Sequence, residues 1–359
     1  MLFLLKCCFK KIRLCGVSVY LVVGSIAYAQ QPAISTDSVM TTPVEHVRGV
    51  EQTFLTYPEW FLVFSPAEYA AFVRQHSPTD FPFMGHVGQF WSGYRSVVQK
   101  SRSMGHDLNT GYHVMIMVIG ISTTVEYTLR AIYEGTLGAL SNATSGGVRT
   151  AEEEFAAHVA QDYVNFIRVL PWYEYDFWKQ LKLLWVEVPI ERDHVVRCWE
   201  RRFALTTEYG TKAIYALLIK AATQMTYEPA LLVTAIEIKP LPAMTMEWSN
   251  ITVLDHAPNG AAMVTVPRYD AFMSYAKTLA IRGADFQQIA GNQSVILVSL
   301  LGQTGWQPQT GVDEILFVQP ILTQHGRQRV VVTMQVRGLA KALREWTNSG
   351  VEVEHIFDY

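Results

Sequence analysis

The stretch TGYHVMIMVIGISTTVEYTLRAIYEGTLGAL, residues 110–140, decides how the rest of the chain must pack. Its first half is apolar on almost every side, and its second half carries Glu126, Arg130 and Glu134. A helix that is apolar nearly all round is normally buried on most sides. A membrane span needs about 20 predominantly apolar residues, and Glu126 ends this run after about fifteen. We therefore expect the central helix of a soluble domain, with membrane insertion as the alternative.

The composition is that of a folded protein with one large or two medium domains. The chain has 359 residues, of which 50% are hydrophobic, 12% aromatic and 17% charged. This is enough apolar side chain for a sizeable core. Disordered chains are poor in aromatic and apolar residues, so low-complexity disorder is excluded.

Residues 1–29 have the layout of a bacterial secretory signal peptide. Four basic residues precede an apolar core at residues 16–26, and the tripeptide Ala-Tyr-Ala at 27–29 offers a small-x-small cleavage site. The apolar core is short for a membrane span. We expect cleavage after residue 29 and a periplasmic or secreted protein. The alternative is an uncleaved anchor at residues 12–28 that attaches the protein to the membrane.

Removal of the signal peptide changes the charge and the cysteine content. It takes away four basic residues and no acidic one, so the formal net charge moves from −3 to −7. A mildly acidic protein without a basic run is a poor candidate for binding nucleic acid. Of the four cysteines only Cys198 remains, which excludes an internal disulfide. We expect Cys198 to be buried and inert, with a nucleophilic role as the alternative.

The first part of the mature chain has helical periodicity. Residues 30–51 are polar and are expected to form a flexible tether before an all-helical domain at residues 52–228. Residues 57–60 are expected to form a turn or a short extended piece. Ser65, Pro66 and Glu68 then fit the N-cap, first and third positions of a new helix. Helices are predicted at residues 66–75, 86–104, 110–140, 151–170, 172–185 and 193–223.

The last part of the chain has the alternation of a sheet protein. Residues 229–359 are expected to form a smaller α/β sandwich, which makes the whole chain an α+β protein. The order of elements fits a ferredoxin-like fold with one extra strand, and we find no internal repeat. Strands are predicted at residues 233–238, 251–254, 263–266, 295–300, 315–323, 330–336 and 351–357, and helices at 269–289 and 339–347.

Six segments between residues 54 and 292 carry a resemblance. They are YPEWF, WSGYRSV, GISTTVEYTLRAIYEGTLG, LPWYEYDFWKQL, ERRFALTTEYGTKAIYA and VPRYDAF…IAGN. Together they resemble a family of uncharacterised bacterial exported or envelope proteins. That family has no assigned activity, so the resemblance implies a folded envelope protein and no catalytic residue, substrate or cofactor.

Three charged residues of the 110–140 helix are candidate catalytic residues. Glu126, Arg130 and Glu134 share one helix face at a spacing of four. An arginine between two carboxylates could tune them for acid–base chemistry. The two acids lie two turns apart, too far to share a proton, and a structural ion network is favoured. That network predicts that Glu126→Gln lowers the melting temperature more than the surface change Lys341→Gln.

Two aromatic segments are candidates for ligand binding. Each places a carboxylate among large rings beside a proline. Ring faces of this kind could form a wall for a cationic or sugar-like ligand. Packing of rings where two bends of the chain meet explains the same residues and is favoured. The residues are Tyr57, Glu59 and Trp60 in the first segment and Trp172, Tyr173 and Glu174 in the second.

Metal and cofactor motifs are weak or missing in the sequence. Glu154 and His158 are four residues apart, and Glu191 and His194 are three apart. The second spacing is half of the Glu-x-x-His pattern of di-iron bundles, which needs a second copy and two further Glu residues. We therefore predict no metal and no cofactor. The sequence has no phosphate-binding loop, nucleophile elbow or His-Glu-x-x-His motif.

These observations favour a non-catalytic binding or envelope-associated protein with a small molecule as its candidate ligand. The alternative is an enzyme that uses helix-borne carboxylates, with or without a metal.

Overall fold

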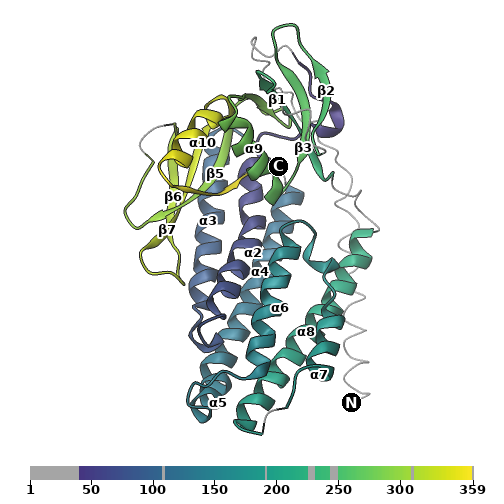
Figure 1. Ribbon diagram of the computed structural model, residues 1–359, viewed down its shortest axis with the longest axis vertical. Helices are drawn as coiled ribbons and strands as arrows, with labels where there is room; N and C mark the ends of the chain where they lie inside the picture. The colour runs from purple at the N-terminus through teal and green to yellow at the C-terminus, as the bar shows by residue number, and fades with distance from the viewer. Residues whose placement is uncertain are drawn as a thin grey trace. The chain divides into compact units, whose positions relative to one another are not determined.

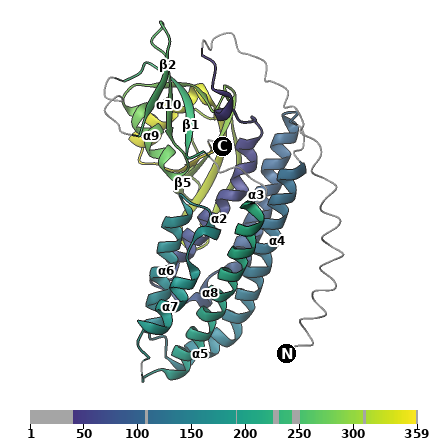
Figure 2. The same cartoon turned by 90° about the vertical axis from the view of Figure 1, so that its right-hand side faces the viewer.

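The computed structural model describes residues 40–106, 110–190, 192–224, 231–242, 250–308 and 311–357. The predicted signal peptide lies outside them. The chain from Ser38 to Tyr359 forms one compact unit by its contacts. Figures 1 and 2 show its two sheets at one end of a group of long helices. The fold is therefore α+β, with helices first and sheets second.

Helix α2 (Gln52–Phe72) packs against two other helices and against the second sheet (Figure 1). The rings of Phe54, Tyr57 and Phe61 are at most 1% exposed. Helices α3 (Phe83–Ser103) and α6 (Ala151–Ile167) both lie along α2. The central position therefore belongs to α2 and not to residues 110–140.

Helix α2 also runs through two prolines. The predicted turn at 57–60 and the predicted helix start at Ser65 are both wrong, because Pro58 and Pro66 lie inside one continuous helix. Each proline removes one backbone hydrogen bond, but the buried rings on both sides of it hold the helix together. Ser65 does not cap a helix. Its hydroxyl lies 3.0 Å from His86 Nδ1 and 2.7 Å from the Tyr127 hydroxyl.

Residues 110–140 are helical, as predicted, and the helix extends to Thr144, but most of this stretch is not buried. Helix α4 (Thr110–Tyr133) continues through a π-helical turn at Glu134–Gly138 into α5 (Ala139–Thr144). Only 17% of its most apolar 18-residue window is buried. By length and composition it is the one helix among the described residues that could cross a membrane. The prediction that this helix is buried in the domain is therefore wrong. An apolar helix must avoid water, but its sequence does not specify what covers it.

The remaining helices complete the helical part. A short turn at Trp172–Glu174 leads into α7 (Phe177–Val186), and α8 (Val195–Gln224) is the long helix predicted at 193–223. Helices α6, α7 and α8 share an apolar cluster of their own. Its buried members include Val159, Leu184 and Leu205.

The described part of the predicted tether is ordered against the first sheet. Met40, Thr42 and His46 are each at most 9% exposed. Thr42 donates a hydrogen bond to Gln288 Oε1 at 2.9 Å, and Gln288 Nε2 donates to the Met40 carbonyl at 3.0 Å. The prediction of a flexible segment is therefore wrong for residues 40–51. Thr42 and the Met40 carbonyl both bond to Gln288, a strand residue that sequence analysis had placed in a helix.

The C-terminal part contains two four-stranded antiparallel sheets of the same topology. In each, three strands are followed by a helix and a fourth strand, in the orders β2-β3-β1-β4 and β6-β7-β5-β8. The first module holds β1 (Val233–Lys239), β2 (Thr252–His256), β3 (Ala262–Pro267), α9 (Asp270–Ile281) and β4 (Asp285–Ile289). The second holds β5 (Val295–Gln303), β6 (Glu314–Pro320), β7 (Arg327–Gln335), α10 (Leu339–Asn348) and β8 (Glu352–Ile356).

This repeat of structure was not visible as a repeat of sequence. The ferredoxin-like arrangement, a single sheet with two helices, is not confirmed. The predicted helix 269–289 ends at Ile281, where Gly283 adopts a φ of 91° and turns the chain into β4. A positive φ is accessible to glycine at little cost. Beyond it, Phe286 and Gln288 point inward as strand residues.

Both faces of the second sheet are buried, which joins the two halves of the chain. Successive side chains of a strand point to opposite faces. Ile296 and Val298 of β5 therefore enter the core shared by both sheets with α9 and α10. Leu297 of β5 and Val331 of β7 face α2, where they contact the cluster around Phe54. The predicted boundary at residues 228/229 is thus bridged by packing.

Candidate functional site

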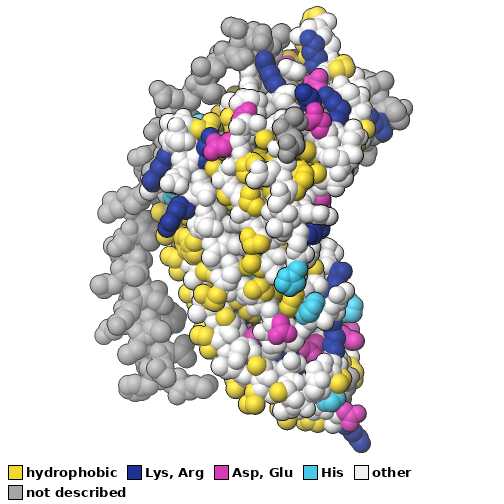
Figure 3. Space-filling model, turned by 90° about the vertical axis from the view of Figure 1, so that its left-hand side faces the viewer, with side chains coloured by type: hydrophobic (Ala, Val, Ile, Leu, Met, Phe, Trp, Pro, Cys, Tyr) yellow, Lys and Arg dark blue, Asp and Glu magenta, His cyan; other side chains and the backbone are white. Residues whose placement is uncertain are grey.

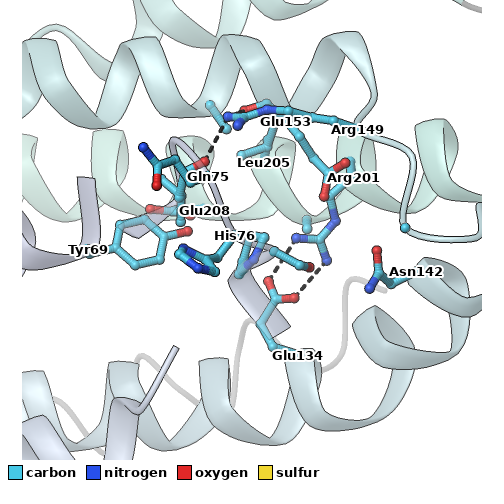
Figure 4. A pocket seen from close by; sticks show the side chains of 16 residues that line it. Tyr69, Gln75, His76, Glu134, Asn142, Arg149, Glu153, Arg201, Leu205 and Glu208 are labelled. Atoms are coloured by element: carbon cyan, nitrogen blue, oxygen red, sulfur yellow. Dashed lines mark hydrogen bonds and ion pairs between the residues drawn. The ribbon is translucent and has the colours of Figure 1, made fainter. Parts of the chain in front are cut away.

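A polar cavity of about 90 Å³ lies inside the helical part. It is enclosed by the end of α2, the π-helical turn after α4, the start of α6 and the middle of α8 (Figure 4). Many of the residues that line it have charged or hydrogen-bonding side chains. Among them are Tyr69, His76, Glu134, Asn142, Arg149, Glu153, Arg201 and Glu208.

The π-helical turn shapes one wall of this cavity. Such turns widen a helix by one residue and often occur at functional sites. Glu134 begins the turn and Gly138 ends it. A Cβ atom on Gly138 would collide with the Glu134 carboxylate and lie 3.2 Å from an Arg201 guanidinium nitrogen. Glycine at this position therefore leaves room for the pair between Glu134 and Arg201.

The ion pairs in the wall are buried and specific. Arg201 is 4% exposed, and its two terminal nitrogens donate to the two Glu134 oxygens at 2.9 and 3.0 Å. Its Nε donates to Glu200 at 2.7 Å. Arg197, which is fully buried, donates to Glu153 at 2.5 Å and to Glu200 at 3.0 Å. Two-point contacts of this kind fix the guanidinium plane.

A second group of charges continues along the same seam between α4 and α8. Glu208 pairs with Arg130 and accepts a hydrogen bond from Lys212 at 2.9 Å. Burial alone would raise the pKa of Glu208, but Arg130 and Lys212 hold it at about 2. Glu126 lies 3.2 Å from Lys212 and 3.6 Å from Arg130.

The three candidate catalytic residues of α4 are thus divided between two groups. Glu126 and Arg130 form an i, i+4 pair, whereas Glu134 pairs with Arg201 of α8. The structure places all three in ion pairs that join α4 to α8. The partners on α8 were missed by sequence analysis because they lie about 70 residues further along the chain, and spacing rules act only within one helix. Their signal was the cluster ERR at 200–202.

The first aromatic segment packs against the second sheet and against α4. Tyr57 is buried, and its hydroxyl donates to Gln319 Oε1 at 3.1 Å. Trp60 stacks on His355 with ring centroids 3.6 Å apart. Glu59 accepts a hydrogen bond from the Tyr112 hydroxyl. The ring of Tyr57 is therefore closed to a ligand in this structure.

The second aromatic segment packs against α8. Trp172 lies over Tyr215 with ring centroids 5.3 Å apart, and Tyr173 contacts the edge of Trp172. Glu174 pairs with Lys220 at 2.5 Å. The two segments thus have different partners, the second sheet in one case and α8 in the other.

The candidate metal ligands do not converge in the described residues. Glu154 and His158 are exposed on α6, and Glu191 lies outside the described residues. Among the residues that the structure describes, no group of three or more His, Cys, Asp or Glu side chains could hold a metal ion. Cys198 is buried, as expected.

A buried Ser–His–Glu group was also missed. Ser65 contacts His86 Nδ1, and His86 Nε2 lies 3.7 Å from Glu68, which accepts a hydrogen bond from Arg329 at 2.9 Å. Hydrolytic triads use these residue types, but Ser65 is 2% exposed and His86 0%. Burial and the nearby Arg329 lower the pKa of His86 to about 4. The group is therefore closed to a substrate and ties α2 and α3 to the second sheet.

No protein-family model, no curated protein and no solved structure matches this chain.

Proposed function

We propose that this protein is a non-catalytic binding protein of the bacterial envelope whose ligand occupies the charged cavity of the helical part. The observation that carries the proposal is the cavity itself, a hollow of about 90 Å³ whose wall includes Tyr69, Glu134, Arg201 and Glu208. Binding sites for small molecules are concave and place a few polar groups around the ligand.

The charges of the wall indicate the class of ligand. Glu134 faces Arg201, Glu153 faces Arg197, and Glu208 faces Arg130 and Lys212. Each carboxylate of the wall already has a cation as its partner, so none is left to bind a cationic ligand. A strongly charged ligand would break one of these pairs, and breaking a buried pair is unfavourable. The ligand is therefore a small polar molecule that is uncharged or zwitterionic.

The alternative of carboxylate catalysis has less support. An efficient general acid or base has a pKa near the working pH. Glu126 and Glu134 are both held in ion pairs, and the pKa of Glu208 lies at about 2. Glu208 is therefore arranged to stay ionised, and Glu126 and Glu134 are already occupied by lysine or arginine partners.

The test is a thermal denaturation screen with free amino acids, small amides and polyols. A ligand stabilises the folded state by about 2.7 kcal/mol when its concentration is 100 times its dissociation constant. We expect at least one of these compounds to raise the melting temperature. Ala204→Leu fills the cavity and should abolish the rise, whereas Ala71→Leu on the exposed side of α2 should leave it unchanged. A rise that persists in Ala204→Leu would place the ligand elsewhere.

Export is tested separately. We expect protein recovered from the periplasm to begin at Gln30. A chain that still begins at Met1 and stays with the membrane fraction would show an uncleaved anchor instead.

A further inference from the structure

The outer side of α4 and α5 is apolar along its whole length. The two acidic residues and the arginine of 110–144 all form ion pairs with residues of α8. Large hydrophobic side chains repeat at helical spacing on this side, and each is between 40 and 68% exposed. They are Val114, Met117, Val118, Ile121, Val125, Leu129, Ile132, Leu137 and Leu140.

The outer side of α8 has the same character. Its charged residues are buried or half-buried, with Arg197, Arg201 and Arg202 at most 4% exposed. Its large hydrophobic residues are 37 to 64% exposed instead. They are Val195, Val196, Trp199, Phe203, Ile214, Tyr215, Leu217 and Leu218.

The two helices carry these residues on a joined surface. Arg130 and Glu126 of α4 pair with Glu208 and Lys212 of α8, which holds the helices side by side. Phe203 is exposed and contacts the ring of Tyr133, with centroids 6.5 Å apart. We call the exposed hydrophobic residues of α4, α5 and α8 the apolar face. Figure 3 shows hydrophobic side chains at the surface of the helical part.

This arrangement reverses the order found in proteins surrounded by water. A surface helix there turns its apolar stripe to the core and its charges to the solvent. Helices in contact with lipid keep their charged residues inside, paired with one another. In α8 every arginine is inside and paired, and the phenylalanine and leucines are outside.

We infer that the apolar face lies against the hydrocarbon of a lipid bilayer, with α4 and α8 in the plane of the membrane. Lipid fits better than a second copy, because protein interfaces carry a polar rim and hydrogen bonds, whereas the charged side chains of α4 and described α8 are engaged in ion pairs. The two most exposed, Glu126 and Lys220, pair with Lys212 and Glu174. Amphipathic helices that lie in the plane bury one face to a depth of about 5–10 Å.

The other faces of the helical part exclude a spanning arrangement. Glu154, His158 and Asp162 are exposed on α6, and Arg95 and Arg102 are exposed on α3. A bundle that crossed the bilayer as a single copy would place these side chains in hydrocarbon, which is strongly unfavourable. Attachment in the plane of the membrane leaves these charged side chains in water. It is also independent of any anchor at residues 12–28, because it uses the folded helices.

The first test is flotation of the full chain with phosphatidylcholine vesicles. We expect Ile121→Glu/Leu129→Glu to lower vesicle binding at least tenfold. The matched variant His158→Glu/Asn165→Glu adds the same charge on the exposed side of α6 and should bind like the wild type. Because the chain is acidic, phosphatidylglycerol should not strengthen binding. Equal loss in both double variants would overturn the inference.

The second test measures how deep a labelled residue lies in the bilayer. It therefore distinguishes membrane binding by the apolar face from membrane binding by residues 1–29. In a background with Ser at Cys7, Cys8 and Cys15, an environment-sensitive fluorophore is attached at Leu129→Cys or His158→Cys. Vesicles with quenchers in the acyl chains should quench the first label and spare the second. Failure to quench the label at 129 would overturn the inference. The inference would also fail if the label at 129 moved into an apolar environment without vesicles, simply as the protein concentration rises. That result would assign the apolar face to a second copy of the chain.

Discussion

Glu134 rather than Glu126 carries the buried end of the ion network at the scale of single residues. Glu134 is 8% exposed and makes a two-point pair with the buried Arg201. The Glu126 side chain is 42% exposed, and its partners Arg130 and Lys212 both retain Glu208. The ion pair between Glu134 and Arg201, in which both partners are shielded from water, therefore contributes most to the stability of the fold.

We expect Glu134→Gln to lower the free energy of unfolding by about 3 kcal/mol, because it leaves a buried arginine with one fewer carboxylate. Glu126→Gln should cost roughly 0–1 kcal/mol, as a partly exposed pair does. The large loss that the sequence predicted for Glu126→Gln is thus expected for Glu134→Gln instead. Urea denaturation of both variants, with Lys341→Gln as the surface control, measures the difference. Equal losses for Glu126→Gln and Glu134→Gln would contradict it.

The second residue-scale prediction concerns His355. It is 1% exposed and stacked on Trp60, and burial lowers its pKa to about 3. A histidine in an unfolded chain has a pKa of about 6.5. The folded state therefore binds fewer protons, so stability is full above pH 6.5 and is lost as the pH falls toward 3.

Each such histidine contributes a slope of up to about 1.4 kcal/mol per pH unit in this window. We expect the unfolding free energy of His355→Phe to fall less steeply between pH 6.5 and 5 than that of the wild type. The slope is compared, and not the absolute stability, because the substitution changes packing. Parallel slopes would show that His355 is not held neutral by folding.

At the scale of elements, α2 illustrates a helix defined by its neighbours. Ser65 lies in mid-helix between Pro58 and Pro66 and bonds to His86 of α3 and Tyr127 of α4. The same serine at a helix start would bond only to its own backbone. The two arrangements differ in whether Ser65 and Tyr127 are coupled.

We expect a double-mutant cycle of Ser65→Ala and Tyr127→Phe to show an interaction energy of about 1 kcal/mol. Both singles should destabilise the protein, since Ser65→Ala removes the partner of the buried Tyr127 hydroxyl and Tyr127→Phe leaves Ser65 with His86 alone. Thermal or urea unfolding of the four proteins gives the cycle. Additive losses would return Ser65 to the role of an N-cap.

At the scale of the whole molecule, Arg329 connects the helical part to the second sheet. It is 1% exposed and donates to Glu68 of α2 at 2.9 Å and to Glu354 of β8 at 2.5 Å. The cluster of Phe54, Leu297 and Val331 lies at the same junction. Two parts that share a core and a buried charge should unfold together.

We expect calorimetry of the full chain to show one transition, and Arg329→Met to lower it as a whole by about 3–5 kcal/mol, because two carboxylates lose a buried partner. The matched surface change is Arg327→Met, whose pair with Glu352 is exposed. A second, unshifted transition would mean that residues 52–228 and 229–359 are separate domains, as limited proteolysis between residues 227 and 242 would then also show.

Sequence alone determined the local structure of most of the chain. The long helices α3 and α8 and the strands β1, β3, β5 and β7 follow from periodicity, because hydrophobic spacing records which side of an element is covered. The α+β class followed in the same way. A buried Cys198 was expected from the same pattern and is found.

Only the tertiary structure decided what each surface faces. The same pattern that predicts a buried helix at 110–140 also fits a helix with an uncovered apolar side, since hydropathy records avoidance of water and not the identity of the cover. The prolines of α2, the repeated sheet modules and the partners of Glu134 all depend on residues far apart in the chain. Contacts of that range leave no local spacing to read, so the cavity and the apolar face appear only once α4 and α8 lie side by side.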